Sequence, residues 1–245
     1  MEIIVSDRQD SAYHLALEEY LFSKVSREFA VIYVNAPCVI IGCNQVLENE
    51  VDVDFCNQNA IPVLRRMSGG GAVYHDFGNL NYSFITNKTG AKTSLNAEFL
   101  KPVIAALTYF GVFPLVGKRK DLWLPDGFKI SGTAAHITAN RALHHGTLLY
   151  DADLERLSAC LSPKTINTEL KGIASVPSPV KNIHVFLQEN NLPRYQAAVF
   201  VKKFIEKMKI VLGFPPVFKI DSHTQAEIEL LAEKKYRSDS WNRKK

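Results

Sequence analysis

The chain has 245 residues, of which 47% are hydrophobic and 22% charged, and its net charge is +4 at pH 7. These values are typical of a globular protein, and so small a charge excludes a chain-wide demand for nucleic acid. No apolar run approaches the ~20 residues of a membrane span. The N-terminus, MEIIVSDRQD, has no signal-peptide pattern, and the four cysteines match no zinc spacing. We therefore expect reduced thiols and a cytoplasmic protein.

The first predicted element is a helix over residues 11–26, where apolar side chains recur every four positions behind a cap at Asp10 or Ser11. Buried strands are predicted at FAVIYV (29–34) and CVIIG (38–42), and a short strand at IPVLRR (61–66). The alternating segment LNYSFIT (80–86) indicates a half-buried strand. Residues 95–110 then predict a helix that Gly111 ends.

The second half begins with a hairpin, predicted over residues 121–137 around a Pro-Asp-Gly turn, and RALHHGTLLY (141–150) is expected to pair with it. A short helix is predicted at 151–161, a proline-broken loop at 171–183 and a long helix at 194–213. Ser222 and Gln225 are spaced as the capping box of a last helix. The basic run 234–245 favours a solvated tail over a docking patch for an acidic partner. This order of elements predicts an α+β fold, with a mixed, largely antiparallel sheet flanked by helices.

A triple glycine is the first candidate functional feature. Ser68-Gly69-Gly70-Gly71 follows two arginines, Arg65 and Arg66. Glycine lets backbone N–H groups approach a ligand, and arginine offers a planar fork for phosphate or carboxylate. The segment matches neither a Walker A loop nor a GxGxxG fingerprint. An anion site is favoured, and a simple tight bend between strands is the alternative.

Lys129 is the second candidate, because it alternates with apolar Phe128 and Ile130 on a predicted strand. It faces either a cleft, where it could neutralise developing charge, or solvent at a sheet edge. The adjacent histidines 144 and 145 point to opposite faces and are expected to be structural. Leucine neighbours predict burial of Cys160, and no GxSxG or Ser-His-Asp pattern stands out.

Four segments together resemble the lipoate–protein ligase family, whose catalytic fold is shared with biotin–protein ligases. They are HLALEEYLF, CVIIGCNQ, RRMSGGGAVYHDFGNLNYSF and DGFKISGTAAHITANRALHHGTLL. GIASVPSPVKNI and YRSDSWN also look like family segments, so the resemblance covers nearly the whole chain. It implies a single catalytic domain over residues 1–245, without the C-terminal accessory domain of many members.

The resemblance also implies a two-step reaction. Lipoate and ATP form lipoyl-adenylate, and the lipoyl group then passes to a lysine of an acidic acceptor, a lipoyl domain of a 2-oxoacid dehydrogenase or a glycine-cleavage protein. A separate accessory chain is one possible partner, and magnesium is expected with ATP. Lys129 is implied as the catalytic residue that contacts both the lipoyl carbonyl and the phosphate. The other residues implied in binding are Arg66, Gly71, Ala72, Val73 and Tyr74 for ATP or the adenylate, Gly70, Gly71 and His75 for lipoate, and Asp121 for magnesium.

Two positions depart from the family pattern: Lys120 stands where many members have asparagine, and Cys43 where a basic residue is common.

The alternatives to an ATP-dependent ligase are a lipoyl- or octanoyltransferase that uses a preformed activated acyl group, and a non-catalytic lipoate-binding protein. Transferases of this fold that take acyl groups from a protein donor use a cysteine nucleophile. The segment before Lys129 has no cysteine, which argues against that chemistry.

Overall fold

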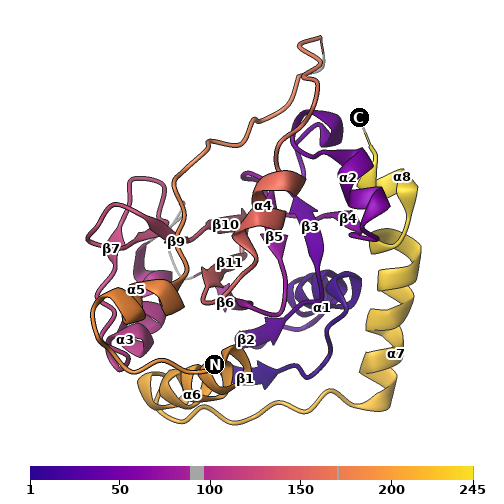
Figure 1. Cartoon of the computed structure of the whole chain (residues 1–245). Coiled ribbons are helices and arrows are strands. Elements are labelled where there is room, and N and C mark those ends of the chain that lie inside the picture. The colour runs from indigo at the N-terminus through magenta and orange to yellow at the C-terminus, as the bar shows by residue number, and fades with distance from the viewer. Residues whose placement is uncertain (89–96, 170, 245) are drawn as a thin grey trace.

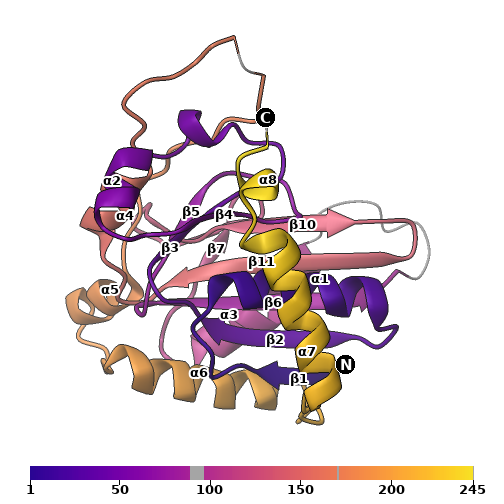
Figure 2. The same ribbon diagram turned by 90° about the vertical axis from the view of Figure 1, so that its right-hand side faces the viewer.

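The computed structural model describes residues 1–88, 97–169 and 171–244. Its main sheet has five strands, which lie side by side in Figure 2 in the order β1-β2-β6-β11-β10. They are β1 (Glu2–Val5), β2 (Phe29–Val34), β6 (Asn79–Asn87), β11 (Arg141–Leu149) and β10 (Thr133–Ile137). Only the β1–β2 pair of this sheet is parallel, and the other three pairs are antiparallel.

Two three-stranded sheets flank the main one. The first has the order β4-β3-β5, with β4 (Val63–Arg65), β3 (Cys38–Ile41) and β5 (Val73–His75). The second has the order β7-β8-β9, with β7 (Leu115–Val116), β8 (Leu122–Trp123) and β9 (Lys129–Ser131). The first sheet carries the glycine bend between β4 and β5, and the second carries Lys129.

Helices cover these sheets (Figure 1). The α-helices are α1 (Ser11–Lys24), α2 (Val53–Gln58), α3 (Lys101–Thr108), α4 (Leu154–Cys160), α5 (Ile183–Glu189), α6 (Ala197–Val211), α7 (Ser222–Leu231) and α8 (Asp239–Asn242). Short 3₁₀ turns lie at Leu47–Asn49 and Ala97–Leu100, and a π-helical turn at Ala232–Tyr236 follows α7.

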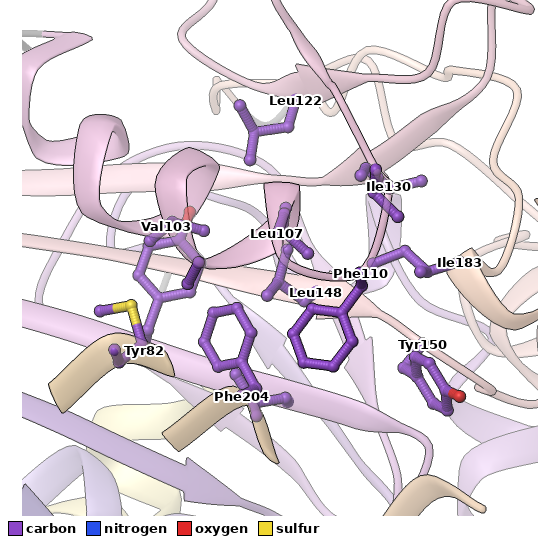
Figure 3. Packing of buried hydrophobic residues seen from close by; sticks show 14 of the residues in the cluster. Tyr82, Val103, Leu107, Phe110, Leu122, Ile130, Leu148, Tyr150, Ile183 and Phe204 are labelled. Carbon is purple, nitrogen blue, oxygen red and sulfur yellow. The ribbon is translucent and has the colours of Figure 1, made fainter. Parts of the chain in front are cut away.

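The buried apolar residues form three clusters, one for each interface between layers. The largest packs one face of the main sheet against α3, α5 and α6, and Figure 3 shows Tyr82 and Leu148 of the sheet beside Leu107 and Phe204. The second packs the opposite face against α1, α7 and the π-helical turn. The third joins the β4-β3-β5 sheet to α2 and α4.

Strand β6 shows how the sequence creates a polar wall inside the protein. Leu80, Tyr82 and Phe84 point into the largest cluster, as the period of two for a strand requires. Asn81 and Ser83 therefore point to the opposite face, and both are buried there. Buried polar side chains need partners or a ligand, so this face is where a site is expected.

The α+β prediction is confirmed, and most predicted elements lie where the sequence indicated. The predicted 121–137 hairpin is only half right: β8 and β9 pair, but after Gly132 the chain moves into the main sheet as β10. The strands β1, β5 and β7 were not predicted. The cap of α7 is Asp221, which accepts from the Thr224 amide at 2.7 Å, rather than Ser222. The first two positions of the predicted 95–110 helix lie outside the described residues.

The solvated tail predicted for residues 234–245 is wrong over the part of it that the structure describes. Tyr236 is fully buried and Asn242 is only 7% exposed. The aromatic rings of Tyr236 and Trp241 pack in the second cluster against α1 and β4, while Lys234 and Lys244, on either side of them in the sequence, are exposed. Lys235 and Lys244 lie over the Trp241 ring at 4.1 and 3.9 Å, so even these charges take part in the packing.

Three buried histidines make the fold sensitive to acid. Burial lowers the pKa of His14 to about 4, that of His75 to about 3 and that of His144 to about 4, from a usual 6.5. The side chain of Asn35 joins the first two, at 2.6 and 3.0 Å. Each histidine is neutral when folded but takes up a proton near pH 6.5 when unfolded.

We therefore predict that the free energy of unfolding is highest above pH ~6.5 and falls as the pH drops toward 4. Denaturant titrations at several pH values check this. A transition midpoint that stays constant over that range would contradict the burial of neutral histidines.

Candidate active site

A cavity of about 360 Å³ lies between the main sheet and the β4-β3-β5 sheet. The main sheet contributes Tyr33, Asn81, His145 and Thr147. The small sheet faces them with Ile40, Val73 and His75, and Leu15 of α1 adds another apolar side chain. The remaining wall comes from the glycine bend, from Lys129 with its charged neighbours, and from residues 173–176 of the loop between α4 and α5.

The strand register fixes the long dimension of the cavity. Tyr33 pairs with Asn81, and Asn81 with Thr147, so these side chains form one row across β2, β6 and β11. Thr147 in turn accepts from the Gly132 amide at 3.1 Å, beside Lys129. Three strand spacings separate β10 from β2, a span of ~14 Å. The cavity is thus an elongated slot with cations at one end and Tyr33 at the other.

The guanidinium group of Arg66 fixes the glycine bend through hydrogen bonds. Its Nη2 donates to the carbonyls of Gly69 at 2.5 Å and Gly71 at 2.8 Å, and its Nη1 to that of Ile40 at 3.2 Å. Its Nε donates to the Ser68 hydroxyl at 2.9 Å. Burial lowers the pKa of Arg66 to about 10, so it remains a cation at neutral pH.

This capture decides where the amide groups of the bend point. In a trans peptide the C=O and the following N–H are opposed, so carbonyls drawn toward Arg66 send the amides of Gly70 and Ala72 the other way. The Ala72 amide donates to the Ser175 hydroxyl at the cavity wall, at 2.9 Å. Gly70 has φ +87, which favours glycine, so the bend needs this residue type as well as the arginine.

Lys129 reaches the same cavity from β9. Its Nζ lies 3.2 Å from the Oδ2 atom of Asp121, which also pairs with Arg119 at 3.7 Å. Burial lowers the pKa of Lys129, Asp121 opposes this effect, and Arg119 adds to it. Burial would raise the pKa of Asp121, but the Trp123 indole and Lys129 outweigh it, and the pKa is lowered. The pair therefore presents a partly desolvated ammonium to the slot.

The surroundings of Asp121 do not resemble a ready-made metal site. Its carboxylate is shared between two cations, and in residues 1–88, 97–169 and 171–244 no three His, Cys, Asp or Glu side chains gather as metal ligands do. A hard divalent ion would need oxygen ligands from elsewhere, such as the phosphates of a bound nucleotide.

The loop between α4 and α5 extends beyond one end of the molecule in Figure 1, and its residues 173–176 lie at the cavity, where Ser175 contacts Ala72. Ser175 is its anchor: the Ser175 amide donates to Glu50, and the hydroxyl accepts from Gln45 at 3.1 Å. A Cβ on Gly71 would lie 2.8 Å from that hydroxyl oxygen. Further along, the Lys129 amide donates to Pro179 at 2.9 Å, so the loop also fixes the lysine backbone.

The structure brings most of the residues implied by the sequence to this cavity. Its lining includes Arg66, Gly70, Gly71, Ala72, Val73, His75, Asp121 and Lys129. Tyr74 is the exception, because its side chain points to the third apolar cluster on the opposite face of β5. Sequence reasoning missed Leu15, Tyr33, Asn81, Thr147 and Ser175. The alternation of β6 was the one available signal, since it places Asn81 opposite a buried apolar face.

Comparisons with known proteins agree with this geometry. Residues 10–209 match the family model described as the lipoyl protein ligase A/B catalytic domain. The chain is 36% identical over 235 residues to lipoate-protein ligase LplJ of Bacillus subtilis, covering 95% of this chain and 70% of that protein. It is also 36% identical over 237 residues to lipoate–protein ligase 1 of Staphylococcus aureus, with the same coverage of both chains.

One solved structure of similar fold comes from an archaeal lipoylation system, described as a bi-partite lipoate protein ligase and its E2 lipoyl domain from Thermoplasma acidophilum. It superposes with a TM-score of 0.81 at 26% identity, covering 99% of this chain and 95% of that one. With the slot, the clamped glycine bend and Lys129 in one place, these matches show that the chain belongs to the lipoate–protein ligase family.

Proposed function

We propose that this protein attaches lipoate to a lysine of acceptor proteins through a lipoyl-adenylate made from lipoate and ATP. The observation that carries the proposal is the convergence of two groups on one slot. The amides of the glycine bend and the Lys129 ammonium both line it, and its far end is lined by apolar and aromatic side chains. A mixed anhydride of a fatty acid and a phosphate needs both features.

The first step is the attack of the lipoate carboxylate on the α-phosphorus of ATP, with pyrophosphate leaving. Lys129 is the residue that would hold the carboxylate and the phosphate together, and burial leaves its ammonium only partly hydrated. The Gly70 and Ala72 amides would donate hydrogen bonds to the phosphate oxygens and so stabilise their negative charge. Such positioning and charge stabilisation need no covalent intermediate with the protein.

The acyl chain occupies the slot between the two sheets. Leu15, Ile40 and Val73 supply apolar contacts along it. A five-carbon acid arm ending in a ring fits a slot that runs from Lys129 toward Tyr33, and an unbranched octanoyl chain needs a similar one. Burying the chain also shields the anhydride from water, which protects it until an acceptor arrives.

The second step is transfer to the acceptor lysine, whose amine attacks the carbonyl as AMP leaves. We propose acidic lipoyl acceptor domains as the partners, of 2-oxoacid dehydrogenases or of the glycine-cleavage system, in the cytoplasm. The name of the archaeal relative, a bi-partite ligase with its E2 lipoyl domain, supports an acceptor of this kind. It also supports a separate accessory chain as a second partner. Magnesium would enter with the ATP phosphates as part of the substrate.

A transferase that starts from a ready-made acyl donor is the alternative. Where such enzymes use a cysteine, the thiol must reach the acyl group. The cavity lining, as far as the structure describes it, contains no cysteine, and Cys38, Cys56 and Cys160 are fully buried. This observation favours the adenylate route.

The mass of the acceptor protein after reaction distinguishes a ligase, a transferase and a lipoate-binding protein. We expect an apo acceptor domain to gain one lipoyl group both with lipoate and magnesium-ATP and with preformed lipoyl-adenylate. Modification only with the adenylate would assign the protein as a transferase, and modification in neither arm would leave a lipoate-binding protein. Intact-mass spectrometry reads all three outcomes.

Lys129→Ala should reduce adenylate formation by about 10²-fold or more, the usual loss when one such charge-stabilising donor is removed. Lys164→Ala is the matched control, since that lysine is 62% exposed and pairs with Asp52 and Asp54 at the surface. Pyrophosphate release in the presence of lipoate measures the rate. Equal rates for the two variants would remove Lys129 from the reaction.

The two charged neighbours of Lys129 shift its pKa in opposite directions, which allows a test of its role. Asp121 raises the pKa of Lys129 and Arg119 lowers it. Because the lysine acts as a cation, Asp121→Asn should move the alkaline loss of adenylation to lower pH, and Arg119→Gln should move it to higher pH. Rate profiles from neutral pH to about 10 measure both shifts. Shifts of the same sign in both variants would show that another group sets the alkaline limit.

A further inference from the structure

Three side chains behind the glycine bend form a continuous series of hydrogen bonds. The Ser68 hydroxyl lies 2.6 Å from Nε2 of His145, and Nδ1 of the same ring lies 2.8 Å from Oε2 of Glu18. These residues come from the β4–β5 connection, β11 and α1. Sequence reasoning found no Ser-His-acid pattern, because the three positions are far apart in the chain.

The bonding partners give the series a direction. The Glu18 carboxylate can only accept, so His145 donates through Nδ1, and in the neutral imidazole its Nε2 accepts from the Ser68 hydroxyl. The Ser68 oxygen in turn accepts from Nε of Arg66 at 2.9 Å. Glu18 also accepts from the hydroxyls of Tyr33, at 3.0 Å, and of Ser83. The chain of donors therefore runs from Arg66 to Glu18.

This arrangement resembles the nucleophile, base and acid of a hydrolase, but its surroundings exclude that role. Ser68 is fully buried and does not line the cavity. Its oxygen already accepts a hydrogen bond from Arg66. An attacking hydroxyl must reach its substrate, and here the substrate cannot come within bonding distance.

We propose that Glu18, His145 and Ser68 are positioning residues that lock the Arg66 guanidinium and, through it, the phosphate-binding amides of the glycine bend. This inference rests on the proposed adenylation reaction. Arg66 can hold the carbonyls of Gly69 and Gly71 only while its plane is fixed. Among the described bonds of Arg66, only the one from Nε–H goes to a side chain, that of Ser68. The others go to backbone carbonyls.

The charge state of Glu18 is consistent with this role. Burial would raise the pKa of Glu18, but His145 and the hydroxyls of Ser83 and Tyr33 outweigh it, so the pKa is lowered and the carboxylate is an anion. A buried anion and a buried cation thus lie at the two ends of one hydrogen-bonded series. Each hydrogen bond between them is strengthened by those charges.

Two substitutions break the relay of hydrogen bonds that runs from Arg66 to Glu18, and neither residue lines the cavity. Ser68→Ala removes the link between Arg66 and His145, and Glu18→Gln removes the terminal charge while keeping the shape. Each should lower the kcat of adenylate formation about tenfold or more and change the KM for lipoate little, because the amides act on the phosphate in the transition state. The double variant should lose no more than the worse single one.

Ser83→Ala is the matched control. It removes another hydrogen bond to the same Glu18 carboxylate, from a side chain that is equally buried, but it leaves the path to Arg66 intact. Its kcat should stay within about twofold of the parent protein. Thermal melts of all variants separate a loss of folded protein from a loss of turnover.

A second measurement tests the relay independently of chemistry. Nitrogen-15 spectra should show the Arg66 Nε–H of the parent protein as a slowly exchanging signal. In Ser68→Ala and Glu18→Gln this signal should be lost, and the amide signals of Gly70 and Ala72 should shift, while Ser83→Ala leaves both in place. If the parent protein forms no adenylate but these shifts occur, the proposed function fails and the relay stands. Unchanged spectra, or kcat losses equal to that of the control, would overturn the relay.

Discussion

The capture of two glycine carbonyls by one buried arginine is the interaction on which the site depends. Glycine-rich segments have many conformations, and their amides serve a ligand only when they point the same way. Arg66, which itself lines the cavity, imposes that order by bonding to the carbonyls of Gly69 and Gly71. The arginine thus shapes the proposed anion site through these bonds and also lines it, and Lys129 supplies a second cation there.

A second arginine holds the surroundings of the bend in the same manner. Arg65 is 1% exposed and donates to six carbonyls, three in the 42–45 loop and three in the C-terminal segment. The 42–45 loop touches the bend directly, since a Cβ on Gly42 would lie 2.1 Å from the Gly70 oxygen. Adjacent arginines at the end of β4 therefore fix the bend and its support, and the C-terminal segment becomes part of the framework of the proposed site.

Sequence reasoning went furthest where local patterns decide structure. The period of the strands, the glycine run and the odd placement of Lys129 were enough to predict an anion site at a sheet. They could not show the direction of Arg66, because a guanidinium beside glycines can face a ligand or the backbone equally well. The outward direction of the Tyr74 side chain could have been predicted, since a strand that turns Val73 and His75 inward must turn Tyr74 outward. The C-terminal segment was predicted to be solvated because it has more charged residues than aromatic ones. Burial of the Tyr236 and Trp241 rings nevertheless decides where it packs.

The contact between Ser175 and Ala72 has a consequence for how substrate enters. A serine hydroxyl already occupies one of the amides that the anhydride is expected to use, and it comes from the loop that borders the cavity. A phosphate that binds this amide, as proposed, must therefore replace the Ser175 hydroxyl. Swapping one neutral hydrogen bond for one to an anion favours the exchange by about 1 kcal/mol. The bond between Ser175 and Ala72 is thus weak enough for the proposed nucleotide to replace, and the Ser175 hydroxyl would remain close by as a further donor to the phosphate.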